Sequence, residues 1–123
     1  MKEIIAIIRP KMMHKTKETL AEMGFPSITA IPVLGRGKQR GIAEEVSVAI
    51  SPEVLALGKS RGMNYIPKRQ FTLVVRDEEV DTVIQAILRL NQTSNFGDGK
   101  IFVCPVDEAL RIRTDETGEA AIM

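Results

Sequence analysis

The sequence predicts an α+β fold of ferredoxin-like βαββαβ order: a four-stranded antiparallel sheet with two helices on one face. Three observations lead to this prediction. Short β-branched runs occur at four places, apolar stripes of helical spacing follow the first and third, and a patternless gap over residues 36–68 separates two similar halves. We expect all 123 residues to form one domain, because two domains would each be too small to bury a core.

The first half of the chain is predicted to form a strand, a helix and a second strand. Ile4–Ile8 is a continuous β-branched run, typical of a buried strand. Over residues 11–23 apolar side chains recur at helical spacing, and Gly24 stands where a C-cap glycine belongs. Ile28–Leu34 is the second predicted strand, and Pro32 within it indicates a sheet edge or a bulge.

The second half repeats the pattern. Phe71–Val75 has good strand composition, and a helix with an acidic first turn and a clear apolar stripe is predicted over residues 77–88. Ile101–Val103 is the fourth predicted strand, and Leu110–Ile112 a short fifth. Apolar residues on both faces of the strands predict that other copies of the chain cover the face without helices, so we expect an oligomer.

Composition excludes several classes of function. A net charge of +1 gives no bulk electrostatic case for binding nucleic acid or an anionic membrane. No apolar run approaches the ~20 residues of a membrane span, and the N-terminus lacks a signal-peptide pattern, so we expect no membrane insertion and a cytoplasmic protein. The single cysteine, Cys104, lies in an apolar run and is expected to be a buried, inert thiol.

The strongest local signal for chemistry is Gly97-Asp98-Gly99-Lys100, between the second helix and the fourth strand. Closely spaced glycines allow consecutive backbone N–H groups to point at one anion, and a neighbouring lysine adds charge. The spacing differs from that of a Walker A loop. The sequence therefore predicts a phosphate-binding turn, with an ordinary tight turn and a solvated lysine as the alternative.

Two further basic clusters strengthen the case for a polyphosphate ligand. Arg111 and Arg113 would face the same side if they lie in a strand, and either a shared anion or separate carboxylate partners would offset their repulsion. The stretch 35–41 is a glycine-spaced basic hinge at the start of the long gap.

Within the gap, Ser51–Leu57 has the N-cap serine and first-turn proline of a short helix. A gap of this length indicates a functional loop.

Together these motifs resemble the PII (GlnB-like) signalling family over nearly the whole chain. The quoted motifs are Ile7-Ile8-Arg9-Pro10, residues 35–41, Ile66-Pro67-Lys68, residues 97–103 and Arg111-Ile112-Arg113-Thr114. Within this family the chain is most similar to the nitrogenase-associated NifI branch, and specifically to its second member, which has the longer loop. The segments that carry this likeness are the hinge at residues 35–41 and Asn64-Tyr65-Ile66-Pro67-Lys68-Arg69. The resemblance implies a trimeric assembly with ATP or ADP in clefts between subunits.

The resemblance also implies the site residues. Ile7, Thr29 and Val74 would line the adenine and ribose side, and Lys100 would reach the outer phosphates. The implied nucleotide-binding set is Ile7, Thr29, Gly35, Gly37, Lys38, Gln39, Val74, Gly97, Asp98, Gly99, Lys100, Arg111 and Arg113. The implied 2-oxoglutarate set is Gly37, Gln39, Arg40, Gly41 and Lys68. Gln39 would ligate a Mg²⁺ ion that bridges ATP and 2-oxoglutarate, since this ion prefers oxygen ligands.

By this resemblance the chain is a non-enzymatic nitrogen-status regulator. It would consist of a T-loop at about 36–69, a phosphate-binding loop at about 92–100 and a C-terminal segment at 106–123. Its implied target is dinitrogenase, which would be inhibited when nitrogen is plentiful and released from inhibition by 2-oxoglutarate. The acting form would be a homotrimer or a hetero-oligomer with a second PII-like subunit. Two departures are visible. The loop is longer than usual and lacks a tip tyrosine, so nucleotidylylation is not expected, and Ser27 stands where glycine is common.

Other functions stay open at this point. A general PII protein would regulate an ammonium transporter or glutamine synthetase. A weak ATPase would use Lys100, Arg111 and Arg113 as electrostatic stabilisers, although no general base is identifiable near them. A plain ferredoxin-like trimer would bind a metal or another effector. His14 has no second ligand at metal-binding spacing, which favours a surface histidine.

Overall fold

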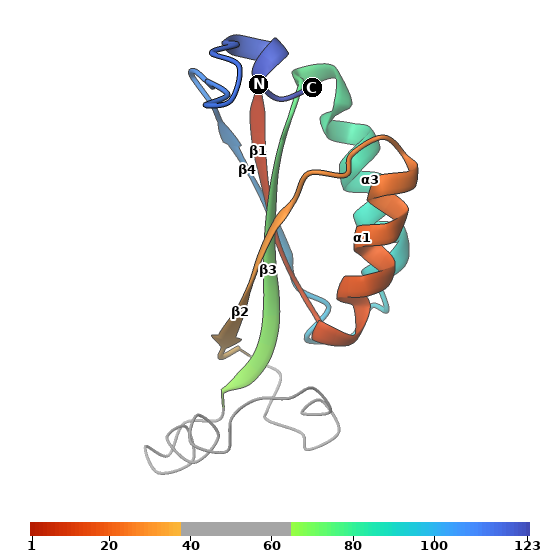
Figure 1. The fold of residues 1–123 in the computed structure, drawn as a ribbon. Coiled ribbons are helices and arrows are strands. Elements are labelled where there is room, and N and C mark those ends of the chain that lie inside the picture. Colours follow the sequence, from red (N-terminus) through yellow and green to blue (C-terminus); the bar gives the residue numbers. More distant parts are fainter. Residues whose placement is uncertain (38–64) are drawn as a thin grey trace.

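The computed structural model describes residues 1–37 and 65–123. Four strands form one antiparallel sheet in the order β2-β3-β1-β4, and both helices cover one face of it (Figure 1). The elements are β1 (Lys2–Ile8), α1 (Met13–Glu22), β2 (Thr29–Gly35), β3 (Ile66–Val75), α3 (Val80–Asn91) and β4 (Lys100–Pro105). This confirms the ferredoxin-like fold, with the long loop between β2 and β3. The helix predicted at Ser51–Leu57 lies outside the described residues.

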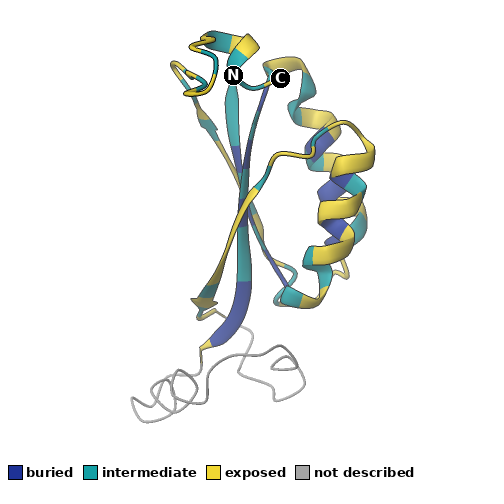
Figure 2. Cartoon of the chain, in the orientation of Figure 1, coloured by how far each residue is buried: buried dark blue, intermediate teal, exposed yellow. Residues whose placement is uncertain are grey.

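The core lies between the sheet and the helices. Alternate residues of β1 and of the Phe71–Val75 part of β3 are buried on this face, while their neighbours on the other face are only half-buried (Figure 2). This is the period of two expected for a strand with one covered face. The buried apolar side chains are Ile4, Ala6, Ile8, Leu20, Phe71, Leu73, Val75, Val83, Ala86 and Ile87.

One polar contact joins the two helices inside this layer. Thr16 is fully buried, and its hydroxyl donates to the Met12 carbonyl at 2.7 Å. The Asn91 amide, near the end of α3, donates to the Thr16 hydroxyl at 3.2 Å and to the Ile87 carbonyl at 2.9 Å. These bonds set the position of the C-terminal end of α3, where the loop to β4 begins.

Strand β3 begins at Ile66, five residues before the predicted start at Phe71. Residues 66–68, which were predicted to end the long loop, therefore belong to the sheet. Pro67 made the segment look irregular. It pairs with Leu34 of β2, but the pairing of β3 with β1 extends only to Arg69. At Pro67 the strand is therefore an edge on one side, where a residue without an N–H is tolerated. Lys68 is consequently held on a strand.

The prediction of a short fifth strand at Leu110–Ile112 is wrong. Leu110 forms only an isolated bridge with Thr117, and the chain between them makes a tight turn. The N–H groups of Thr114 and Asp115 both donate to the Arg111 carbonyl, and Asp115 has a left-handed φ of 61°. The alternation that would place Arg111 and Arg113 on one side of a strand is therefore absent.

The expectation of a buried Cys104 is also wrong for the single chain, where this residue is half-buried. Strand β4 is an edge strand, and Cys104 pairs with Glu3 on the face without helices. We call this face the open face. It also carries Ile31 and Phe102, which are 48% and 47% exposed. Among the described residues, no helix is long and apolar enough to cross a membrane.

Candidate functional site

The loop that joins α3 to β4, residues 92–99, folds around one carboxylate. We call it the α3–β4 loop. Asp98 Oδ2 accepts hydrogen bonds from the backbone N–H groups of Thr93, at 2.7 Å, and Ser94, at 2.8 Å. The Thr93 hydroxyl donates to Asp98 Oδ1. Ser94 has a positive φ of 67°, a conformation that these bonds help to hold.

Arg9 closes this arrangement from the end of β1. Its Nη1 donates to Asp98 Oδ1 at 2.7 Å, and its Nη2 donates to the Phe96 carbonyl at 3.0 Å. Burial of Asp98 favours its neutral form. The hydrogen bonds from the Thr93 hydroxyl, Arg9 and the backbone of Thr93 and Ser94 outweigh this effect and hold the pKa of Asp98 well below its usual range. The carboxylate is therefore ionised and directed into the loop.

Lys68 links the start of β3 to the same loop. Lys68 is only 8% exposed, and its Nζ donates to the Gly97 carbonyl at 2.5 Å. Gly35, at the end of β2, lies beside it: a Cβ added there would be 3.9 Å from the Lys68 Cγ. The start of β3 thus contacts the α3–β4 loop, and the end of β2 lies beside the lysine that makes this contact.

Two glycines give the loop its backbone path. Gly97 and Gly99 have φ values of 96° and 113°, in the left-handed region that side chains rarely adopt. Gly99 also packs directly on β1, since a Cβ there would lie 1.8 Å from the Ile7 carbonyl oxygen. Turns with residues of positive φ form concave arrangements of N–H groups that bind anions. The predicted phosphate-competent turn therefore has a suitable backbone.

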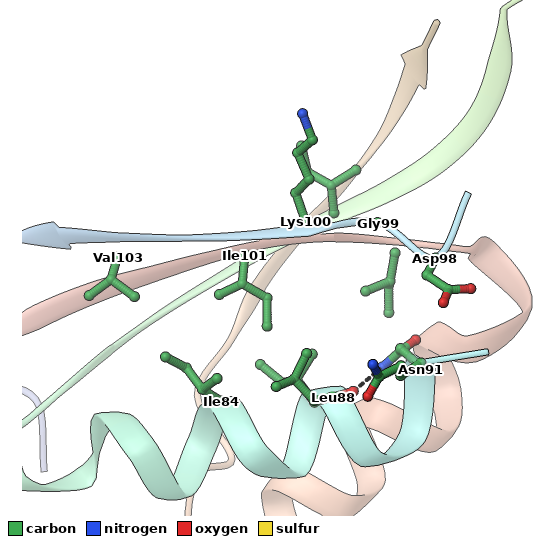
Figure 3. Close-up of a pocket in the computed structure, with 12 residues that line it drawn as sticks. Ile84, Leu88, Asn91, Asp98, Gly99, Lys100, Ile101 and Val103 are labelled. Atoms are coloured by element: carbon green, nitrogen blue, oxygen red, sulfur yellow. Dashed lines mark hydrogen bonds between the residues drawn. The ribbon is translucent and has the colours of Figure 1, made fainter. Parts of the chain in front are cut away.

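Lys100 follows this turn and begins β4. Its side chain is exposed and points away from α3, whereas Ile101 and Val103 point toward the helix (Figure 3). A cleft of about 440 Å³ between α3 and β4 is lined mainly by apolar side chains of Ile84, Leu88, Ile101 and Val103. Lys100 thus directs its ammonium away from α3, although Asp98, Gly99 and Lys100 are among the residues that line this cleft.

A second cluster of predicted residues lies at the other end of the sheet. Thr29, Val74 and Arg111 line a cleft of about 630 Å³ together with Ser27. Arg111 donates to Glu116 Oε1 at 2.8 Å and to the Met123 carbonyl at 2.5 Å. Arg111 thus has its own carboxylate partner, the alternative left open for the arginine pair.

The two clusters are too far apart to hold one phosphate group. Lys100 pairs with Ile7 at one end of β1, and Pro105 pairs with Lys2 at the other. Five residue steps along β4 span about 17 Å. Val74, which lines the second cleft, pairs with Glu3 and so lies at the Lys2 end. Within one chain Lys100 and Arg111 therefore cannot share a phosphate group.

The predicted site residues thus divide into three sets. One set lies at the α3–β4 loop, with Gly35 next to Lys68 at its margin: Ile7, Gly35, Lys68, Gly97, Asp98, Gly99 and Lys100. A second set, Thr29, Val74 and Arg111, meets at the opposite cleft, whose described lining does not include Arg113. Gly37 ends the described N-terminal part, and Lys38, Gln39, Arg40 and Gly41 lie outside the described residues.

Sequence reasoning did not assign a role to Arg9 or Thr93. Both were visible in the sequence, as an arginine directly after an apolar strand and a Thr-Ser pair shortly before the glycine turn. Only the fold shows that they share the carboxylate of Asp98. His14 is exposed and lies 3.0 Å from Glu18, and residues 1–37 and 65–123 contain no cluster of side chains suited to a metal ion.

Comparison with known proteins agrees with this architecture. Residues 1–116 match the family model "Nitrogen regulatory protein P-II". The chain is 54% identical over 122 residues to the nitrogen fixation nifHD1 region GlnB-like protein 2 of Methanosarcina barkeri, covering 99% of both chains. It is also 54% identical over 124 residues to the nifHD region GlnB-like protein 2 of Methanothermobacter marburgensis, covering 99% of this chain and all of that one.

A solved structure shares the fold. The Arabidopsis thaliana PII protein bound to citrate superposes with a TM-score of 0.72 at 28% identity, covering 98% of this chain and 88% of that one. The match over nearly the whole sequence confirms the resemblance noted from the motifs. The chain therefore belongs to the nitrogen regulatory protein P-II family, in the branch of nitrogen-fixation GlnB-like protein 2, and is a signalling protein rather than an enzyme.

Proposed function

We propose that this chain senses nitrogen status by binding ATP or ADP at the α3–β4 loop and, with MgATP, 2-oxoglutarate at the base of the long loop. The observation that carries the proposal is the turn at Gly97 and Gly99, whose positive φ values suit an anion-binding backbone and which the exposed Lys100 directly follows. Lysine at such a turn acts as a compact positive charge toward phosphate oxygens.

The nucleotide site is proposed to be shared between copies of the chain. Lys100 and Arg111 lie at opposite ends of β4, so both can contact one nucleotide only if two subunits supply them. The open face offers an apolar surface for such an assembly, with Ile31 and Phe102 half-exposed in the single chain. We therefore propose a trimer in which the α3–β4 loop of one subunit faces the Thr29–Arg111 cleft of the next.

Binding of 2-oxoglutarate is proposed to act through the ends of the long loop. Lys68 is held against Gly97, so the strand that leaves the long loop is already joined to the phosphate-competent turn. A dicarboxylate beside Lys68 would be stabilised by its charge, and Gln39 would add an oxygen ligand to Mg²⁺. The citrate bound to the Arabidopsis PII protein, itself a polycarboxylate, supports a carboxylate effector.

The proposed target is dinitrogenase. This rests on relatives that are named for nitrogen-fixation regions and on the resemblance to the nitrogenase-associated branch. A second PII-like subunit is proposed to join the acting complex. Effector binding would change the population of long-loop conformations that can reach the target, and hence the affinity for it.

Calorimetry tests the ligands. We expect ADP and MgATP to bind the wild type, and 2-oxoglutarate to bind only with MgATP present. Lys68→Gln should abolish 2-oxoglutarate binding, while Lys15→Gln, which removes an exposed lysine of α1, should not. Binding of 2-oxoglutarate without MgATP, or its persistence in Lys68→Gln, would contradict the proposed site.

A pull-down tests the target. Dinitrogenase should be retained with ATP and released when 2-oxoglutarate is added, with and without the second PII-like subunit. If the amount of dinitrogenase retained does not change when 2-oxoglutarate is added, the proposed switch is refuted. Retention of an ammonium transporter or glutamine synthetase instead would indicate a general PII role.

A further inference from the structure

We propose that Arg9 is a positioning residue for nucleotide binding, which acts by holding the α3–β4 loop from behind rather than by touching the nucleotide. The inference rests on the proposed nucleotide site and adds a residue to it. Arg9 follows β1, and the loop it contacts lies 87 to 89 residues later in the chain. Only the fold brings the two together.

Arg9 contacts the loop at two points. One nitrogen of its guanidinium binds the Asp98 carboxylate at 2.7 Å, and another binds the Phe96 carbonyl at 3.0 Å. These two residues flank Gly97, so the contacts constrain the backbone on both sides of the first glycine. A planar guanidinium suits two fixed acceptors, whereas a lysine ammonium is a compact point charge on a flexible stem.

Arg9 also sets the electrostatics of the turn. Asp98 stands between Gly97 and Gly99, and its ionised carboxylate would repel a phosphate bound there. In the structure this carboxylate accepts hydrogen bonds from Arg9, Thr93 and Ser94. Its charge is therefore compensated inside the loop. We infer that Asp98 organises the turn and is not itself a phosphate ligand.

The Arg9–Asp98 pair is largely buried. The Arg9 side chain is 10% exposed and that of Asp98 is 21% exposed. A charged pair in such surroundings is costly to break by removing one partner, because the other charge is left without compensation. Loss of Arg9 should consequently move the loop, while the core between α1, α3 and the sheet keeps its packing.

The experiment measures ADP binding by calorimetry and backbone amide NMR spectra without nucleotide. The variants are Arg9→Met and Arg9→Lys, and the charge-matched control is Arg89→Met, on the exposed side of α3. Arg9→Met should weaken ADP binding by about ten- to a hundredfold, the effect of losing a charged hydrogen-bond pair. Arg9→Lys should fall between it and the wild type, and the control should stay within about twofold.

The spectra separate positioning from general destabilisation. In Arg9→Met the amide signals of residues 93–100 should shift or broaden, while those of the buried core strands stay in place. Unchanged loop signals, or ADP binding within twofold of the wild type, would overturn the proposal.

If Arg9→Met does not fold, the double variant Arg9→Met/Asp98→Asn removes both charges and avoids the uncompensated one. It should fold and still bind ADP at least tenfold more weakly, and wild-type affinity there would overturn the proposal. A wild-type protein that binds neither ADP nor ATP would refute the proposed function, whereas the loop signals of the nucleotide-free variants would still decide whether Arg9 holds the loop.

Discussion

Replacement of Gly99 by alanine tests how closely the phosphate-competent turn must approach β1. The new methyl carbon would lie 1.8 Å from the Ile7 carbonyl oxygen and 2.9 Å from the Ile7 carbonyl carbon. Both are backbone atoms of a central strand, so they cannot rotate away. The turn would have to retreat until the closest contact rose from 1.8 Å to at least 3.0 Å. In addition, φ at this position is +113°, which disfavours any side chain.

The expected cost has two parts. The left-handed backbone costs alanine about 1–2 kcal/mol relative to glycine, and the overpacking against Ile7 adds about 1–3 kcal/mol. Gly99→Ala should therefore lower the free energy of unfolding by about 2–5 kcal/mol. Gly24→Ala is a matched control, because its φ is +98° but a Cβ there would have no atom within 4 Å. It should show only the backbone part, about 1–2 kcal/mol.

The measurement is urea unfolding at one fixed protomer concentration, since association contributes to the stability of an oligomer. ADP binding is followed in parallel, and we expect Gly99→Ala to lose it because the turn can no longer lie against β1. Equal losses of stability in the two variants, together with normal ADP binding by Gly99→Ala, would refute the argument from close approach.

Two further predictions concern the loop and the core. Asp98→Asn should lower stability at pH 7, and this loss should shrink progressively as the pH is lowered below about 4. The reason is that the pKa of Asp98 is lowered in the folded state, so its contribution is complete above the unfolded value of about 3.9 and is lost only as the pH falls from there through the lowered folded-state value. Urea unfolding over a series of pH values from 7 downward checks this, and a difference independent of pH would contradict it. Leu20→Ala should cost about 2–5 kcal/mol, because Leu20 is fully buried between α1 and the sheet. Ala21→Gly in the exposed part of the same helix is the control and should cost about 1 kcal/mol, so equal losses would show that the Leu20 site is not tightly packed.

The elements of the fold could be predicted because their signals are local. The β-branched run of β1 and the apolar stripe of α3 each reflect the burial of one face, and Gly24 marks the end of α1 with its left-handed φ of 98°. Where a signal depended on neighbours, prediction failed. The start of β3 was missed because Pro67 is tolerated only where β1 no longer pairs, and the predicted strand at Leu110 was in fact a turn.

The candidate site shows the same division. The glycine turn before β4 and its lysine could be predicted from local sequence, because φ freedom and charge belong to single residues. Three features emerge only from the folded chain: Asp98 turns inward to Arg9, Lys68 reaches the Gly97 carbonyl, and Arg111 lies at the far end of the sheet. Those contacts join residues tens of positions apart, and they depend on which strand ends and loops the fold brings together, which local patterns do not specify.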